Sequence, residues 1–134
     1  MRIAHKHRIA REDGQAMVEM ALILPILLML ILAIVQFGIA FNNYITLTDA
    51  TRAGARKASV ARFTGDNGAA ATLVVKQDAS GLDATKLAVA VTSTNWVVPG
   101  SDVTVSASYP YSINILGFTV KSGTMTSTTK ERLE

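Results

Sequence analysis

The feature that most constrains this chain is an apolar block from Met20 to Phe41, 22 residues without a charged side chain. As an α-helix rising about 1.5 Å per residue, the block would be about 33 Å long, enough for a hydrocarbon core of about 30 Å. Its only strongly polar side chain is Gln36. A core helix of a soluble protein of this size would be shorter and polar on one face. The block therefore predicts a helix that spans a membrane.

A cleaved signal peptide is the main alternative for such a block near an N-terminus. Its apolar core would be about 7–15 residues long and would end at a small-residue cleavage site. The present block is longer and continues through Tyr44 into another helical pattern, which favours a retained anchor. Pro25 removes one backbone donor, so we expect a bend near residues 21–25, with or without a functional role.

The charge distribution suggests the orientation of the anchor. Residues 1–14 carry a net charge of +2, from four Lys/Arg and two Asp/Glu, whereas the other 120 residues carry +1. A basic tip suits the cytoplasmic flank of a membrane segment, although Arg52, Arg56, Lys57 and Arg62 follow on the far side. A short inner N-terminus and an extracytoplasmic C-terminal domain are the simpler arrangement. No nucleic-acid-binding motif accompanies the basic residues, so that partner is not expected.

The junction before the apolar block places Gly14 five residues ahead of Glu19. A glycine followed at this distance by a glutamate, between a basic leader and an apolar helix, resembles the processing signature of type IV prepilins and pseudopilins. The resemblance implies that a prepilin peptidase cleaves between Gly14 and Gln15, and that Glu19 acts in subunit assembly. A carboxylate beside an apolar segment is costly unless it has a partner. The new amine on Gln15 could pair with the Glu19 of a neighbouring subunit, if geometry offsets desolvation.

Three segments after the junction carry a further resemblance: Val18–Pro25 reads V-E-M-A-L-I-L-P, Ile34–Gly38 reads I-V-Q-F-G and Leu47–Arg56 reads L-T-D-A-T-R-A-G-A-R. They resemble the V-E-F-A-L-x-L-P opening, the I-x-E-F-G segment and the L-x-x-A-A-R-x-G-A-R segment of the TadE-like family, which belongs to the Tad (tight adherence) pilus system. Met20 stands where an aromatic residue is usual, and Gln36 where glutamate is frequent. Gln36 therefore cannot supply a charge at its position.

The resemblance implies a minor pilin or pseudopilin needed for assembly of Tad pili and for surface adhesion. Its partners would be membrane lipid, the prepilin peptidase, other Tad pilins and assembly-platform proteins. The protein would be a single-pass subunit of the bacterial cytoplasmic membrane, with access to the pilus at the cell surface. A membrane scaffold at the pilus base and a membrane-tethered extracellular binding module remain alternatives.

Beyond the apolar block, residues 42–63 are predicted to continue as an amphipathic helix. Ala50, Gly54 and Ala58 form a stripe of small residues that permits close helix packing. A basic cluster of Arg52, Arg56 and Lys57 lies beside the stripe, either solvated or in contact with headgroups or a partner. Asp49 and Arg52 are one turn apart and are expected to pair weakly.

The remaining residues predict an α+β fold with a small antiparallel sheet of three to four strands. Gly65 is expected to end the long helix, and Asp66 or Asn67 to cap a second helix over 69–80, where the pair Val74-Val75 leaves a strand as the alternative. Alternating patterns predict strands over 86–92, 103–109 and 118–128, with a turn at 99–102. The expected organisation is a leader (1–14), a long helix (15–63) and an extracytoplasmic domain (64–134). Trp96 is expected at the edge of the core, with a binding surface as its alternative role.

The sequence offers no constellation of catalytic residues. The chain has no cysteine, and both histidines, His5 and His7, lie in the predicted leader. The remaining carboxylates are scattered, and the Asp/Asn/Gly loop at 64–68 has too few of them for calcium. We therefore expect neither an enzyme, nor a metal site, nor a cofactor.

Overall fold

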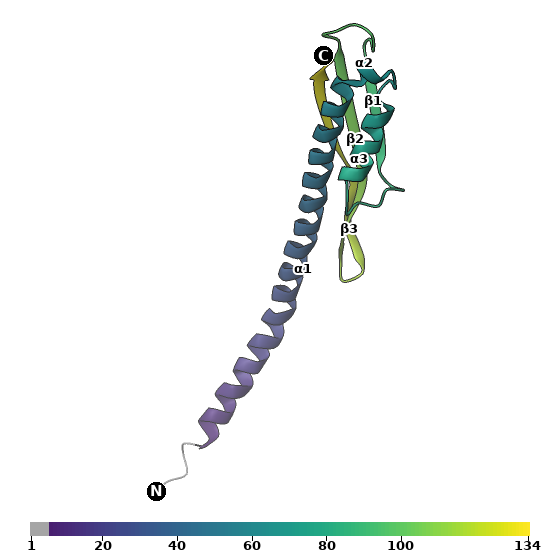
Figure 1. The fold of residues 1–134 in the computed structure, drawn as a ribbon. Helices are drawn as coiled ribbons and strands as arrows, with labels where there is room; N and C mark the ends of the chain where they lie inside the picture. Colours follow the sequence, from purple (N-terminus) through teal and green to yellow (C-terminus); the bar gives the residue numbers. More distant parts are fainter. Residues whose placement is uncertain (1–5) are drawn as a thin grey trace.

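A computed structural model describes the backbone of residues 6–134 and the side chains of residues 14–134. Figure 1 shows one very long helix, α1 (Lys6–Ser59), with a small domain packed against its C-terminal part. The domain contains two short helices, α2 (Ala61–Thr64) and α3 (Ala69–Asp78), and one sheet. This confirms the predicted fold class, a long apolar helix followed by an antiparallel sheet. Most of the predicted basic leader, including Arg2 and both histidines, lies outside the described side chains.

Helix α1 differs from its prediction at both ends. The described helix already begins at Lys6, so the expected cleavage position at Gly14 lies within it. At the other end it stops at Ser59, and Val60 separates it from α2, whereas a single helix was expected to reach residue 63. The Ser59 carbonyl accepts a hydrogen bond from the backbone N–H of Glu134 (3.0 Å), which ties the chain's end to this point. The helix continues through Pro25, and Figure 1 shows a gradual bend along its length.

The sheet contains three antiparallel strands in the order β1 (Ala88–Ser93), β2 (Asp102–Ile115) and β3 (Phe118–Arg132). The predicted alternation is confirmed in β2, where Val103, Val105 and Ala107 are buried and the residues between them are partly exposed. Strand β3 extends to Arg132, beyond the predicted end at 128, because its register with β2 continues to the pair Asp102–Arg132.

The core lies between one face of the sheet, α3 and the C-terminal third of α1. Its fully buried large side chains include Leu47 from α1, Val75 from α3 and Val105 from β2. The buried side of α3 carries Ala71 and Val75, with Ala79 just beyond the helix end. Leu73, which lies outside this buried side, is 62% exposed. The small side chain of Ala71 permits the close packing of this side of α3 on α1.

The loop between α2 and α3 contains the predicted glycine stop, but Gly65 ends α2 rather than the long helix, and the N-cap residue of α3 is Gly68 rather than Asp66 or Asn67. Gly65 adopts a left-handed conformation (φ +68°), and its N–H bonds the carbonyl of Ala61, ending α2. The Asp66 carboxylate then accepts hydrogen bonds from the backbone N–H groups of Ala70 (2.9 Å) and Gly68 (3.2 Å) and from the Thr64 hydroxyl (2.9 Å). These bonds, led by the one from Ala70, lower the pKa of Asp66 from its ordinary value of 3.8.

Asp66→Ala is expected to destabilise the domain by about 1 kcal/mol, because the first turn of α3 loses its acceptor. Because the folded-state pKa of Asp66 is lowered, its contribution is complete above the unfolded-state pKa and is lost as pH falls through the folded-state pKa. Thermal unfolding of the wild type and the variant should therefore differ at neutral pH and converge in strong acid. Asp78→Ala, at the exposed C-terminal end of α3, is the control and should not reproduce this loss. Equal losses in both variants would contradict the capping role.

Candidate functional site

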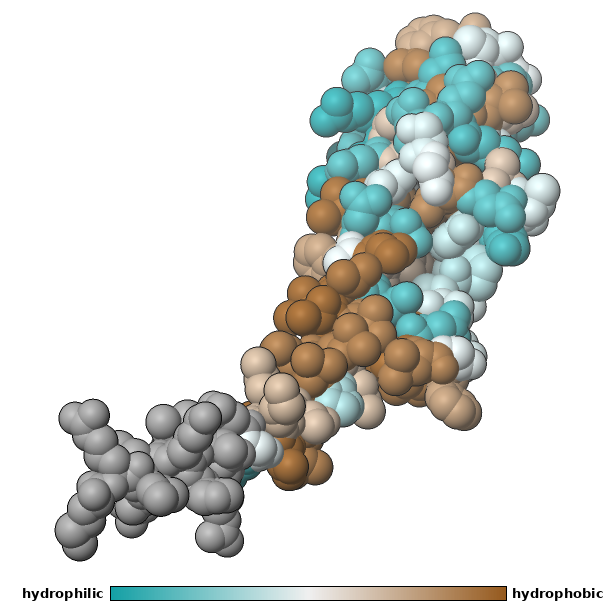
Figure 2. Space-filling model, turned by 90° about the horizontal axis from the view of Figure 1, so that it is seen from below, coloured by the Kyte–Doolittle hydropathy of each residue, from teal (hydrophilic) through white to brown (hydrophobic). Residues whose placement is uncertain are grey.

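The candidate functional site is the part of α1 that the domain leaves uncovered. Its large apolar side chains are widely exposed, from 45% at Tyr44 to 76% at Met17. The described chain contains one helix that is long and apolar enough to cross a membrane, and its most apolar window is unburied. Figure 2 shows apolar (brown) residues gathered next to the grey N-terminal residues, whereas much of the domain is hydrophilic. Such an apolar surface is not stable in water and requires lipid or other protein around it.

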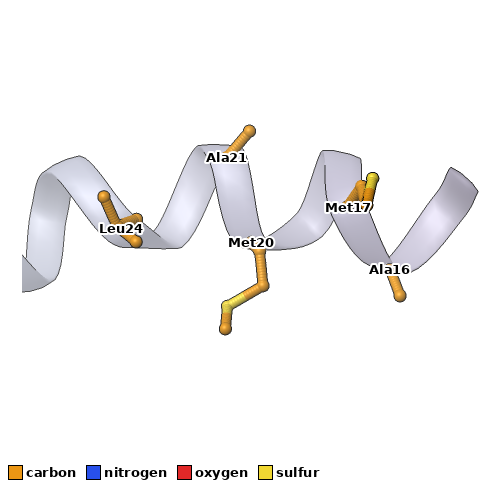
Figure 3. Close-up of a pocket in the computed structure, with 5 residues that line it drawn as sticks. All are labelled: Ala16, Met17, Met20, Ala21 and Leu24. Atoms are coloured by element: carbon orange, nitrogen blue, oxygen red, sulfur yellow. The ribbon is translucent and has the colours of Figure 1, made fainter. Parts of the chain in front are cut away.

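The apolar surface surrounds the helix rather than forming one stripe. Near its N-terminal end, a shallow apolar surface is lined by Ala16, Met17, Met20, Ala21 and Leu24. Figure 3 shows Ala21 and Met20 projecting to opposite sides of the helix. A helix that is apolar on all sides is typical of a membrane span or of the centre of a helical assembly. This geometry fits lipid contact and leaves no room for an enclosed small-molecule site.

The acidic group at the end of this surface is Glu19. Its side chain is exposed, and Oε1 accepts a hydrogen bond from Nε2 of Gln15 (3.2 Å), one turn earlier in the helix. Gln15 and Glu19 therefore share one face of α1. A glutamine donor satisfies one acceptor position of the carboxylate but supplies no positive charge, so Glu19 retains capacity for a cationic partner.

Gly14 lies at the start of the described side-chain region and is open on all sides. A Cβ added to it would meet nothing within 4 Å. Its conformation is helical, with no positive φ that would require glycine. Neither packing nor backbone geometry within this single subunit explains a glycine here. Glycine in a helix does favour local opening, since it costs about 1 kcal/mol relative to alanine.

The small-residue stripe of α1 lies inside the domain. Ala50, Gly54 and Ala58 are buried, and a Cβ added to Gly54 would clash with the Val75 Cγ2 atom and lie 3.3 Å from the Ala71 carbonyl oxygen. The stripe thus faces α3 and β2 of the same chain. Its closeness to α3 explains the small residues without a second subunit.

The basic cluster beside the stripe faces outwards. Arg52, Arg56 and Lys57 are all exposed. Arg52 forms the expected pair with Asp49 (3.4 Å), with both side chains more than 60% exposed, so the pair adds little stability. In the single chain the cluster is solvated, which is the first of its two expected roles. The cluster lies beside the domain, away from the apolar part of α1.

The remaining expectations from the sequence concern metal binding and the position of Trp96. Among the side chains of residues 14–134, no group of three or more acidic or histidine residues is placed to hold a metal ion. Trp96 is half-buried and packs against the core, where its ring would lie 2.7 Å from a Cβ added to Gly68.

The exposed apolar side chains Leu116, Phe118 and Val120 around the β2–β3 turn were not predicted from the sequence. The alternation of apolar and polar residues in 113–121 was the available signal, but it was read only as strand.

Comparison with known protein families identifies the same segment of the chain. The model of the TadE-like protein family matches residues 14–56. Residues 14–56 are thus similar to TadE-like proteins. The match begins at Gly14 and covers Glu19, the apolar part of α1 and most of its packed part, which confirms the resemblance inferred from the sequence. No curated protein and no solved structure matches the chain.

Proposed function

We propose that this protein is a minor pilin or pseudopilin that takes part in assembly of Tad pili and thereby in surface adhesion. The observation that carries the proposal is the coincidence of the TadE-like match with the exposed apolar part of α1. The match starts at the glycine where prepilin processing would occur, and it includes Glu19, the carboxylate directly beside the apolar segment.

In this proposal α1 anchors the protein as a single-pass subunit of the cytoplasmic membrane. The N-terminus lies inside, and the domain that follows residue 42 lies outside the membrane. The exposed apolar side chains between Met20 and Phe41 contact lipid before assembly. During assembly they would exchange lipid for the α1 helices of other Tad pilins, which offer equally apolar surfaces.

Processing after Gly14 would change the electrostatics around Glu19. Cleavage creates an amine on Gln15, which lies about 6 Å along the helix axis from Glu19. The new helix start also places the positive end of the helix dipole near the carboxylate. The amine of one subunit and the Glu19 of another would pair where water is scarce, and the pair would then fix the depth of one subunit against its neighbour.

The mature protein is expected to begin at Gln15 when it is made in a host with an active prepilin peptidase. Gly14→Leu should leave the precursor uncleaved, because a large side chain replaces the glycine expected at the cleavage position. Gly38→Leu is the matched control, since a Cβ at Gly38 also meets nothing within 4 Å and the residue lies far from the cut. N-terminal sequencing reads the result, and an intact Met1 terminus on the unaltered protein would refute processing.

The distribution of the protein between cell fractions tests the role in assembly. A subunit of the filament is expected in the sheared surface fraction together with the other Tad pilins. Deletion of the whole protein should remove pili from the surface in either case. Normal piliation after deletion would contradict the proposed function, whereas loss of pili with the protein found only in membranes would assign it to the pilus base.

A further inference from the structure

The β2–β3 hairpin extends well beyond the rest of the sheet. Strand β1 pairs with β2 only from Val103 to Ser108, whereas β2 and β3 remain paired to Ile115 and Phe118. The end of the hairpin is therefore two-stranded within the described sheet. Leu116 and Gly117, both with positive φ (50° and 85°), form its turn. We call residues 115–120 the hairpin tip.

The hairpin points along α1 towards the apolar segment. At one end, the Glu134 N–H bonds the Ser59 carbonyl, and further along, the Val105 Cγ1 atom would lie 3.5 Å from a Cβ on Gly54. Strand β2 therefore runs antiparallel to α1. As residue numbers rise along β2, the strand passes α1 residues of falling number. Figure 1 shows the turn of β2 and β3 level with the middle of α1, beyond β1 and α3.

The length of β2 brings the tip level with the apolar segment of α1. From Val105 to Ile115 the strand extends about 33 Å, at about 3.3 Å per residue. Gly54 and Phe41 are separated by about 20 Å of helix, at about 1.5 Å per residue. A strand that crosses the helix at an angle advances along the helix axis by less than its full length. An advance of about two-thirds of that length is sufficient to bring Ile115 level with Phe41.

The chemistry of the tip suits a membrane surface. Leu116, Phe118 and Val120 are 58%, 78% and 65% exposed. From Val103 to Thr129, the only charged residue is Lys121, which directly follows the tip. A long lysine side chain beside apolar residues can reach headgroups while its neighbours lie deeper, and its charge is complementary to anionic lipid.

We propose that the hairpin tip inserts into the outer interface of the same membrane that α1 spans, so that the domain is held at two points. This inference rests on the membrane anchor in the proposed function. The insertion is confined to the interface, because beyond Ser108 β2 pairs only with β3, and its other edge has backbone groups without a strand partner in the described sheet. Such groups are not tolerated in the hydrocarbon core but find water and headgroups in the interface. The second point of attachment fixes the tilt of the domain before the subunit leaves the membrane.

The experiment uses nitroxide labels on single cysteines, since the chain has no cysteine of its own. Phe118→Cys reports on the tip, Leu30→Cys on the centre of the apolar segment, and Thr126→Cys on an exposed site of β3 paired with Ser108. The full chain is placed in vesicles of phosphatidylethanolamine and phosphatidylglycerol. Collisions of each label with oxygen, which concentrates in lipid, are compared with collisions with a water-soluble nickel chelate.

The label at 118 is expected to favour oxygen over the nickel chelate, as at 30, while the label at 126 favours the chelate. If the label at 118 behaves like that at 126 while 30 remains in lipid, the insertion is overturned and the anchor stands. If the label at 30 is also in water, the anchor fails, and the proposed function fails with it. Protection at 118 that disappears on tenfold dilution of protein in lipid would assign the tip to a second copy and also overturn the insertion.

Discussion

Glu19→Ala is expected to leave the protein in the membrane at its normal level and to deplete it from assembled pili. Membrane insertion depends on the apolar segment from Met20 to Phe41, which the substitution leaves intact and makes more apolar at its edge. Assembly in the proposed mechanism depends on the pair between Glu19 and the amine of a neighbouring Gln15. Each 1.4 kcal/mol or so lost from that contact lowers the association constant about tenfold. The sheared surface fraction, compared with the membrane fraction, measures the effect.

Two further variants distinguish charge from shape. Glu19→Gln keeps the size of the side chain and one acceptor oxygen but removes the charge, so it should assemble almost as poorly as the alanine variant. Glu131→Ala removes an exposed carboxylate from β3, far from the apolar segment, and should assemble normally. Normal surface levels of the Glu19→Ala protein would exclude the assembly role of this carboxylate.

Gly54→Leu is expected to unfold or loosen the domain while α1 remains in the membrane. Any Cβ at this position collides with the Val75 side chain, and the nearby Ala71 carbonyl oxygen is backbone that cannot simply rotate away. Overpacking a close-packed core costs about 1–3 kcal/mol, and a leucine at a helix-to-helix contact belongs at the upper end of that range. The intrinsic helix preference of leucine over glycine, below about 1 kcal/mol, offsets only part of the loss.

Limited proteolysis of the detergent-solubilised full chain measures this loss, because an opened domain is cut faster. The control is Gly38→Leu, in the same helix and with the same exchange of side chains, but with no atom within 4 Å of the added Cβ. Equal proteolysis of the Gly54→Leu protein and the control would show that the close contact between α1 and α3 does not hold the domain together.

The sequence predicted best those features that depend on local pattern. The apolar segment, the glycine stop at Gly65 and the alternation around Val103 and Val105 each follow from the nearest neighbours in the chain. The TadE-like motifs also lie within one continuous segment, and the family match covers the same residues. These features required no knowledge of which elements meet in space.

Features that depend on tertiary contact were predicted less well. The buried face of α3 is set by the fit of Ala71 and Val75 against Gly54, which spacing within α3 alone does not reveal. The carbonyl of Ser59, at the end of α1, accepts a hydrogen bond from the N–H of Glu134, which lies 75 positions later in the chain. The reach of the β2–β3 hairpin along α1 likewise became visible only from the register and from the position of Val105.

The most direct test of the central claim is whether residues 20–41 hold the protein in a membrane. Membranes from cells that make the full-length protein are washed with alkaline carbonate, which removes peripheral proteins, and are then extracted with detergent. The account predicts that the protein stays in the membrane pellet through carbonate and is released only by detergent. Recovery of a folded, monodisperse protein from the aqueous fraction without detergent would contradict it.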